Sequence, residues 1–298
     1  MKKRIFWGVL LAFCFILPIH AMENIEPVEA AEGTVSGNSV SENNYHFEEV
    51  SVTAESGYEV YRYQLQAQLC EKEMEYLSVL QEAGREKANI ATVKYELGYI
   101  TEIEAKEAEM NVEAIELQMA TAKERLQFYS ECIQLLGGEC KEDMLGGELP
   151  ALSKDYIPVF LEQSSQLSFY HQQIVMYEQA LNTNDLEEKD KQAVGSRLAG
   201  LRADKQAYEI NLKKYVMNLE LQYNTILNEI QQYDNEITLM QLKVQNQKLL
   251  FEKGKTAKST LTEKETELQR LRYERLSKVC NGQLIFYLLE HVIENQTV

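Results

Sequence analysis

The residue types most often used in catalysis or metal binding occur in this sequence, but their spacing matches no known site. The histidines are scattered, and none has a nucleophile or a metal ligand at motif spacing: His20, His46, His171 and His291. Glu113 and Glu116 stand three residues apart, which is typical of a solvated helix face. The sequence contains no glycine-rich phosphate-binding loop. It therefore predicts a protein that is not an enzyme and that binds neither a metal ion nor a cofactor.

Two glycine turns organise the chain. Gly98 and Gly254 each interrupt a long helical pattern that resumes within a few residues. An aromatic residue stands three positions before each glycine: Tyr95 and Phe251. Because glycine adopts the left-handed backbone conformation at little steric cost, each turn is predicted to fold one helix back on another.

The residues after each glycine carry the signal of a new helix. Thr101 with Glu104, and Thr260 with Glu263, fit a capping box, in which two orphan backbone donors at a helix start are satisfied reciprocally. Each copy therefore predicts a helix-turn-helix hairpin with a sharp tip, and the pair is typical of a duplicated half.

Long helices are predicted on both sides of the tips, since no proline occurs after Pro158. The expected helices cover residues 52–97, 102–136, 159–181, 198–253 and 262–293. Apolar residues recur at helical spacing in each of them, and in the second helix they are Ile103, Met110, Ile115, Met119, Ala122, Leu126, Tyr129, Ile133 and Leu136. Helices of this length are stable only against a neighbour, so the pattern predicts coiled-coil packing.

The cysteines leave two alternatives open. Cys132 and Cys140 have no metal-ligand spacing, and neither do Cys70 and Cys280. Cys70 lies 28 residues before the first apex glycine and Cys280 lies 26 residues after the second, so the two would stand at similar heights on the hairpins. A disulfide in an exported protein and two buried apolar cysteines are both consistent with this placement.

The N-terminus has the features of a secretory leader. A basic start, Lys2-Lys3-Arg4, precedes an apolar run over residues 5–17 that is too short to span a membrane, and a break at Pro18 follows. Export to the cell envelope or the extracellular space is expected. The predicted segments are a signal peptide at 1–21, a flexible polar tail at 22–50, a first hairpin at 51–137, a connector at 138–157, and a short helix with the second hairpin at 158–298.

The formal net charge of −17 restricts the partners. Nucleic acid and anionic lipid surfaces attract basic faces, so neither is expected as a partner here. The acidic residues are interpreted as coating solvated helix faces, which keeps an elongated helical protein soluble.

Four motifs in order give the chain a family resemblance. The first tip, Tyr95 to Ala108, is followed by the helix ending Leu135-Leu136-Gly137, by the segment Leu161 to Ile174, and by the second tip at Gly254. In this order they resemble the TolC-type outer-membrane efflux proteins over residues 52–295. The resemblance implies an all-α fold of two tandem antiparallel coiled-coil hairpins, the protomer of a helical barrel. The family's β-barrel strands are not expected, because the polar segment 182–197 stands where the second strand pair belongs.

The resemblance also implies a function. Members of the family are trimers whose hairpin tips dock an adaptor protein that works with an inner-membrane transporter. Carried over to this chain, the docking residues are Gly98, Tyr99, Ile100, Thr101, Gly254, Lys255 and Thr256. The alternative is a secreted coiled-coil protein with a structural or interaction role in the cell envelope and no part in transport.

Overall fold

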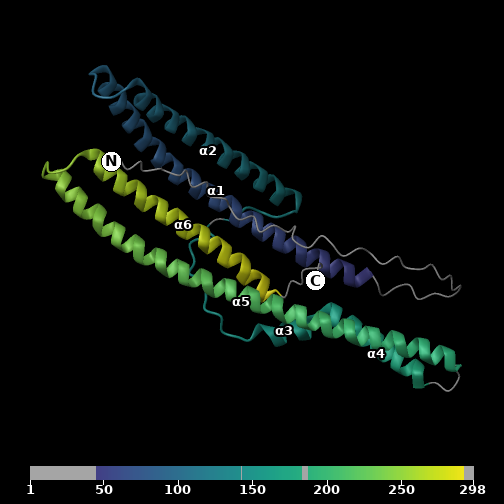
Figure 1. Ribbon diagram of the computed structural model, residues 1–298. Helices are drawn as coiled ribbons and strands as arrows, with labels where there is room; N and C mark the ends of the chain where they lie inside the picture. Colours follow the sequence, from purple (N-terminus) through teal and green to yellow (C-terminus); the bar gives the residue numbers. More distant parts are fainter. Residues whose placement is uncertain (1–44, 142, 183–186, 292–298) are drawn as a thin grey trace, which may run out of the picture. The chain divides into compact units, whose positions relative to one another are not determined.

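The computed structural model describes residues 45–141, 143–182 and 187–291, with side chains from residue 57 onward. Six helices make up this part of the chain: α1 (Tyr45–Glu96), α2 (Glu102–Leu135), α3 (Tyr156–Gln163), α4 (Ser165–Asn182), α5 (Glu188–Glu252) and α6 (Lys258–Glu290). The described residues contain no strand. The predicted all-α class and the two long hairpins, α1–α2 and α5–α6, are confirmed (Figure 1).

Two helices begin well before their predicted first residues. The first helix begins at Tyr45, inside the range assigned to the polar tail. The long helix α5 begins at Glu188, ten residues earlier than expected, because Glu, Lys, Gln and Ala favour helix even without an apolar stripe. The predicted signal peptide and the tail up to residue 44 lie outside the described residues.

The short helix before the second hairpin is divided into α3 and α4 at Ser164. This residue is 2% exposed and has an extended backbone, and its hydroxyl oxygen accepts a hydrogen bond from the backbone N–H of Leu167 at 3.1 Å. The serine therefore acts as a cap for α4, which a reading of apolar periodicity alone does not detect.

The long helices pack side by side in the order α2, α1, α6, α5. Hairpin partners contact each other, and α1 contacts α6, which joins the two hairpins. The shorter helices α3 and α4 pack on α5. Each inner helix therefore has a long neighbour on both sides, whereas α2 and α5 lie at the two edges of the layer.

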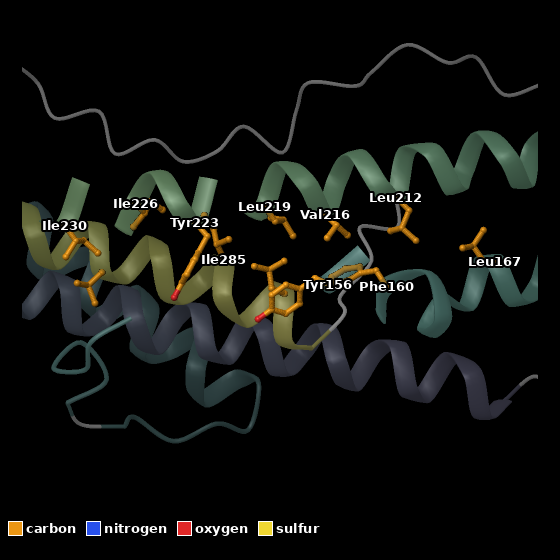
Figure 2. Packing of buried hydrophobic residues seen from close by; sticks show 12 residues of the cluster. Tyr156, Phe160, Leu167, Leu212, Val216, Leu219, Tyr223, Ile226, Ile230 and Ile285 are labelled. Atoms are coloured by element: carbon orange, nitrogen blue, oxygen red, sulfur yellow. The ribbon is translucent and has the colours of Figure 1, made fainter. Parts of the chain in front are cut away.

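The largest apolar cluster lies where α3, α4, α5 and α6 meet (Figure 2). Tyr156, Phe160 and Tyr223 are almost completely buried in it, with Leu212, Val216 and Leu289 around them. Burial of a side chain of this size contributes about 1.5–3 kcal/mol, so this cluster anchors the second half of the chain.

The connector between the hairpins is held by side-chain amides. Gln68 accepts from the backbone N–H of Met144 at 2.8 Å, and its amide nitrogen donates to the carbonyl of Lys141. From α6, Gln283 donates to the carbonyl of Met144 at 2.6 Å. Leu145 of the same segment is buried beside Leu65 and Cys280. The connector is thus fixed against both α1 and α6.

The two cysteines predicted at similar heights are both buried. Cys70 is 3% exposed and Cys280 is 0% exposed, and both are thiols. Cys280 packs with Leu65 and Leu69 in an apolar cluster between α1 and α6. Of the two alternatives, the described structure has the buried apolar cysteines.

A pair of tyrosines on α5 tests how the connector is held. The hydroxyl of Tyr223 donates to the carbonyl of Pro150 at 2.6 Å, whereas the buried hydroxyl of Tyr215 has no hydrogen-bond partner within the described residues. We expect Tyr223→Phe to lower the free energy of unfolding by about 1 kcal/mol or more, because the Pro150 carbonyl loses its donor. Tyr215→Phe is the matched control and should leave stability unchanged or raise it. Urea unfolding followed by circular dichroism measures both, and equal losses in the two variants would contradict the assignment.

Candidate docking site at the hairpin tips

The two tips share one backbone geometry. Gly98 has φ +74° and Gly254 has φ +66°. At the first tip, the N–H of Tyr99 bonds to the carbonyl of Lys94 at 2.8 Å, and the N–H of Gly98 bonds to that of Tyr95 at 2.9 Å. The second tip repeats both bonds, at 2.9 and 2.8 Å, from Lys255 to Leu250 and from Gly254 to Phe251. This is the Schellman arrangement, which satisfies the last carbonyls of a helix and requires the left-handed residue that glycine supplies.

The first return helix starts with the predicted capping box. The Thr101 hydroxyl accepts from the N–H of Glu104 at 3.3 Å, and the Glu104 carboxylate accepts from the N–H of Thr101 at 2.8 Å. These hydrogen bonds favour the charged carboxylate and lower the pKa of Glu104 below its usual value. The turn and its restart therefore form one hydrogen-bonded unit.

The second return helix starts differently, and the predicted capping box of Thr260 with Glu263 is wrong. The helix begins at Lys258 with Ala257 as its N-cap, and no side chain caps it. Thr260 consequently lies inside the first turn, and Glu263 forms an ion pair with Lys87 of α1 at 3.0 Å. A capping pattern marks a helix start only where the backbone has not already become helical.

Ion pairs and a hydrogen bond hold the second tip in place. Lys258 contacts Glu86 of α1 at 3.2 Å, so two ion pairs join the hairpins just below their tips. Within the tip, the amide of Gln247 donates to the hydroxyl of Thr256 at 2.6 Å. The two tips consequently lie at the same end of the paired hairpins (Figure 1).

The structure places all seven predicted docking residues in these two turns. Ile100 and Thr256 are partly buried and the other five are exposed: Gly98, Tyr99, Thr101, Gly254 and Lys255. Residues on either side of the apex glycines are exposed too, with Leu97 and Tyr99 at the first tip and Lys253 and Lys255 at the second. The site is therefore a pair of exposed turns.

Sequence reasoning missed an exposed apolar face on α2. Ile103 and Met110 were expected on the packed stripe, but they are 71% and 57% exposed. They belong to a second stripe, here called the α2 edge face: Ile103, Met110, Leu117, Phe128 and Leu135, all at least 54% exposed. At 100° per residue these five side chains fall within an arc of about 40°. At the same 100° per residue, the stripe lies roughly 100–160° around the helix from the buried Ile115 and Ala122, and this offset separates the two faces.

A matching stripe runs along α5. Its members are exposed and are here called the α5 edge face: Ile210, Met217, Leu221, Leu239, Leu242 and Leu249. They fall within an arc of about 80° by the same helical geometry. Since α2 and α5 are the edges of the layer, both faces lie where a further helix can pack.

The described residues carry no group of acidic, histidine or cysteine side chains that could hold a metal ion. Over the same residues, no helix combines the length and the apolar character needed to cross a membrane.

Comparison with known proteins yields matches to solved structures alone: no family model matches the chain, and no curated protein matches it in sequence. The CusC structure, from work on the folding of that protein and on transmembrane channel formation, aligns with a TM-score of 0.65 at 12% identity over 80% of this chain and 77% of CusC. The outer membrane protein VceC of Vibrio cholerae aligns with a TM-score of 0.54 at 10% identity, covering 83% and 71%. The outer membrane channel CmeC of Campylobacter jejuni gives 0.52 at 11% identity, covering 83% and 64%.

These structures confirm, at the level of the fold, the resemblance to TolC-type outer-membrane efflux proteins that the motifs indicated. Identities of 10–12% show the fold alone, so function needs its own argument.

Replacing the apex glycines tests the turn geometry. A Cβ added at Gly98 or Gly254 meets no atom within 4 Å, so the cost of Gly→Ala there is the strain of a positive φ alone. We expect each variant to lose roughly 1 kcal/mol of stability. Gly200→Ala is the control, because this residue lies inside α5 with open space around it, and there alanine should stabilise the helix by up to about 1 kcal/mol. Thermal unfolding monitored by circular dichroism gives the sign of each change, and stabilisation by Gly98→Ala would refute the strain argument.

Proposed function

We propose that this chain is a TolC-like component of an envelope export system, in which three copies form a helical duct. The number three is the one that the family resemblance implies. In this arrangement the α2 edge face of each copy packs on the α5 edge face of the next, and repetition of the contact closes a ring.

The observation that carries the proposal is that three residues of the α2 edge face match three residues of the α5 edge face in height. Ile103 and Leu249 each lie five residues from their apex glycine, and Met110 and Leu242 each lie twelve residues from it. Farther down, Leu135 and Met217 each lie 37 residues from the apex. Because α2 runs away from its tip and α5 runs toward its own, the two helices are antiparallel neighbours when the tips of adjacent copies are level. Equal residue counts then mean equal heights, at 1.5 Å per residue.

Charge supports the same register. Lys243 is exposed on one flank of the α5 edge face, eleven residues from the apex, and Glu107 is exposed beside the α2 edge face at nine residues. In an antiparallel pair of helices these flanks lie on the same side. Opposite charges at such flanking positions select partner and register in coiled coils.

In the proposed function the tips dock an adaptor protein, and the duct receives its cargo from an inner-membrane transporter. The tips suit this role because they are exposed, closed by Schellman hydrogen bonds and located at the same end of the paired hairpins. The localisation that follows is the cell envelope.

A second candidate is a coiled-coil protein of the envelope that has no transport role. The observation that favours it is the continuation of α5 as helix back to Glu188, close to the end of α4 at Asn182. End-on electron-microscopy images of the purified protein distinguish the two: a hollow ring supports the duct, and a thin solid rod supports the alternative.

Cysteine cross-linking tests the interface directly. In a background with Cys132→Ser and Cys140→Ser, we expect the pair Met110→Cys and Leu242→Cys to form disulfide-linked multimers under mild oxidation, because the two side chains face each other between copies. Non-reducing gel electrophoresis measures the product.

The control moves one cysteine by two helical turns. Met110→Cys with Leu249→Cys places the thiols about 10 Å apart in height, which exceeds disulfide reach, so little product is expected. Equal cross-linking of both pairs, or cross-linking by Met110→Cys alone, would show that copies associate in a different way.

A further inference from the structure

The two tips have the same backbone but opposite surface chemistry. The residues before and after the apex glycine are Leu97 and Tyr99 at the first tip, and Lys253 and Lys255 at the second. All four are exposed. Since one turn geometry accommodates apolar side chains in one copy and ammonium groups in the other, the turn itself does not require lysine at these positions.

The surroundings of the second tip are basic as well. Residues 248–258 contain four lysines and one glutamate, in a chain whose net charge is −17. The equivalent stretch of the first tip, residues 92–102, contains one lysine and two glutamates. The second tip is therefore positively charged, whereas the chain as a whole is negatively charged.

Intramolecular contacts account for only part of this charge. Lys258 is paired with Glu86. Lys253 lies at the C-cap of α5, where the helix dipole favours a cation. Among the described residues, however, neither Lys253 nor Lys255 forms an ion pair or a side-chain hydrogen bond. Both lysines are exposed to solvent on either side of the apex glycine.

We propose that Lys253 and Lys255, here called the basic tip, bind carboxylate groups on a partner protein, while the first tip contacts an apolar part of the same partner through Leu97 and Tyr99. This rests on the proposed function, in which the tips dock an adaptor. The proposal adds the chemistry of the partner. The partner's docking surface carries acidic patches that meet the basic tip and apolar patches that meet the first tip.

Carboxylates fit the basic tip better than the phosphates of a lipid surface. Two lysines on one turn can approach a small acidic patch, whereas an anionic membrane would also meet the glutamates of the neighbouring first tip and the negative charge of the long helices. Complementary charge of this kind contributes mainly to the rate and specificity of association.

Carbodiimide coupling to a glutamate-rich peptide of about 15 residues tests the proposal on the full chain, since the reaction joins carboxylates to lysines that they contact. Mass spectrometry then maps the coupled lysines. We expect coupling at Lys253 and Lys255 to exceed that at Lys189, an exposed lysine at the other end of the same helix, by about tenfold at low salt, and to decline as salt screens the contact.

Matched variants complete the test. Lys253→Glu with Lys255→Glu should abolish peptide coupling, whereas Lys189→Glu with Lys191→Glu changes the net charge equally and should preserve it. Uniform coupling along the chain, or no coupling, would overturn the proposal, and so would lysine-dependent sedimentation with phosphatidylglycerol vesicles. The disulfide cross-link between Met110→Cys and Leu242→Cys measures association between copies independently of peptide binding. If the basic-tip variant loses that cross-link, the lysines act between copies and the partner proposal fails.

Discussion

Long helices in water need a neighbour along most of their length, and this requirement governs the whole molecule. Helix α1 has 52 residues and α5 has 65, far more than a globular core needs. Each can remain folded because an apolar stripe packs lengthwise on the next helix. Helices α1 and α6 satisfy the requirement twice, whereas α2 and α5 present a second stripe with no described neighbour. The edge faces are exposed apolar stripes of the same kind, and in the proposed ring each one packs on the edge face of another copy.

The turns at Gly98 and Gly254 have the same backbone geometry but carry different side chains. The Schellman bonds use backbone groups alone, so the side chains beside the glycine can vary without changing the fold. That freedom explains how two hairpins with the same turn geometry can present apolar residues at one tip and lysines at the other. A fixed backbone with variable side chains is also what the proposed docking role requires.

Similarity to the solved channel structures follows from the same physics. The fold depends on helical periodicity, on glycine turns with positive φ and on buried apolar volume, all of which many sequences satisfy. An identity of 12% with CusC at a TM-score of 0.65 is therefore understandable.

The sequence by itself determined the all-α class, the two hairpins and the apex glycines, because periodicity, capping and positive φ are local properties. The first capping box was predictable for the same reason, and the second failed because α6 begins earlier than its capping pattern indicates. Only the tertiary structure decided which apolar stripe of α2 is buried: Ile115 and Ala122 face α1, while Ile103 and Met110 face outward. Helical periodicity predicts that an apolar stripe exists. Which helix packs on that stripe depends on contacts between segments that are distant in the sequence.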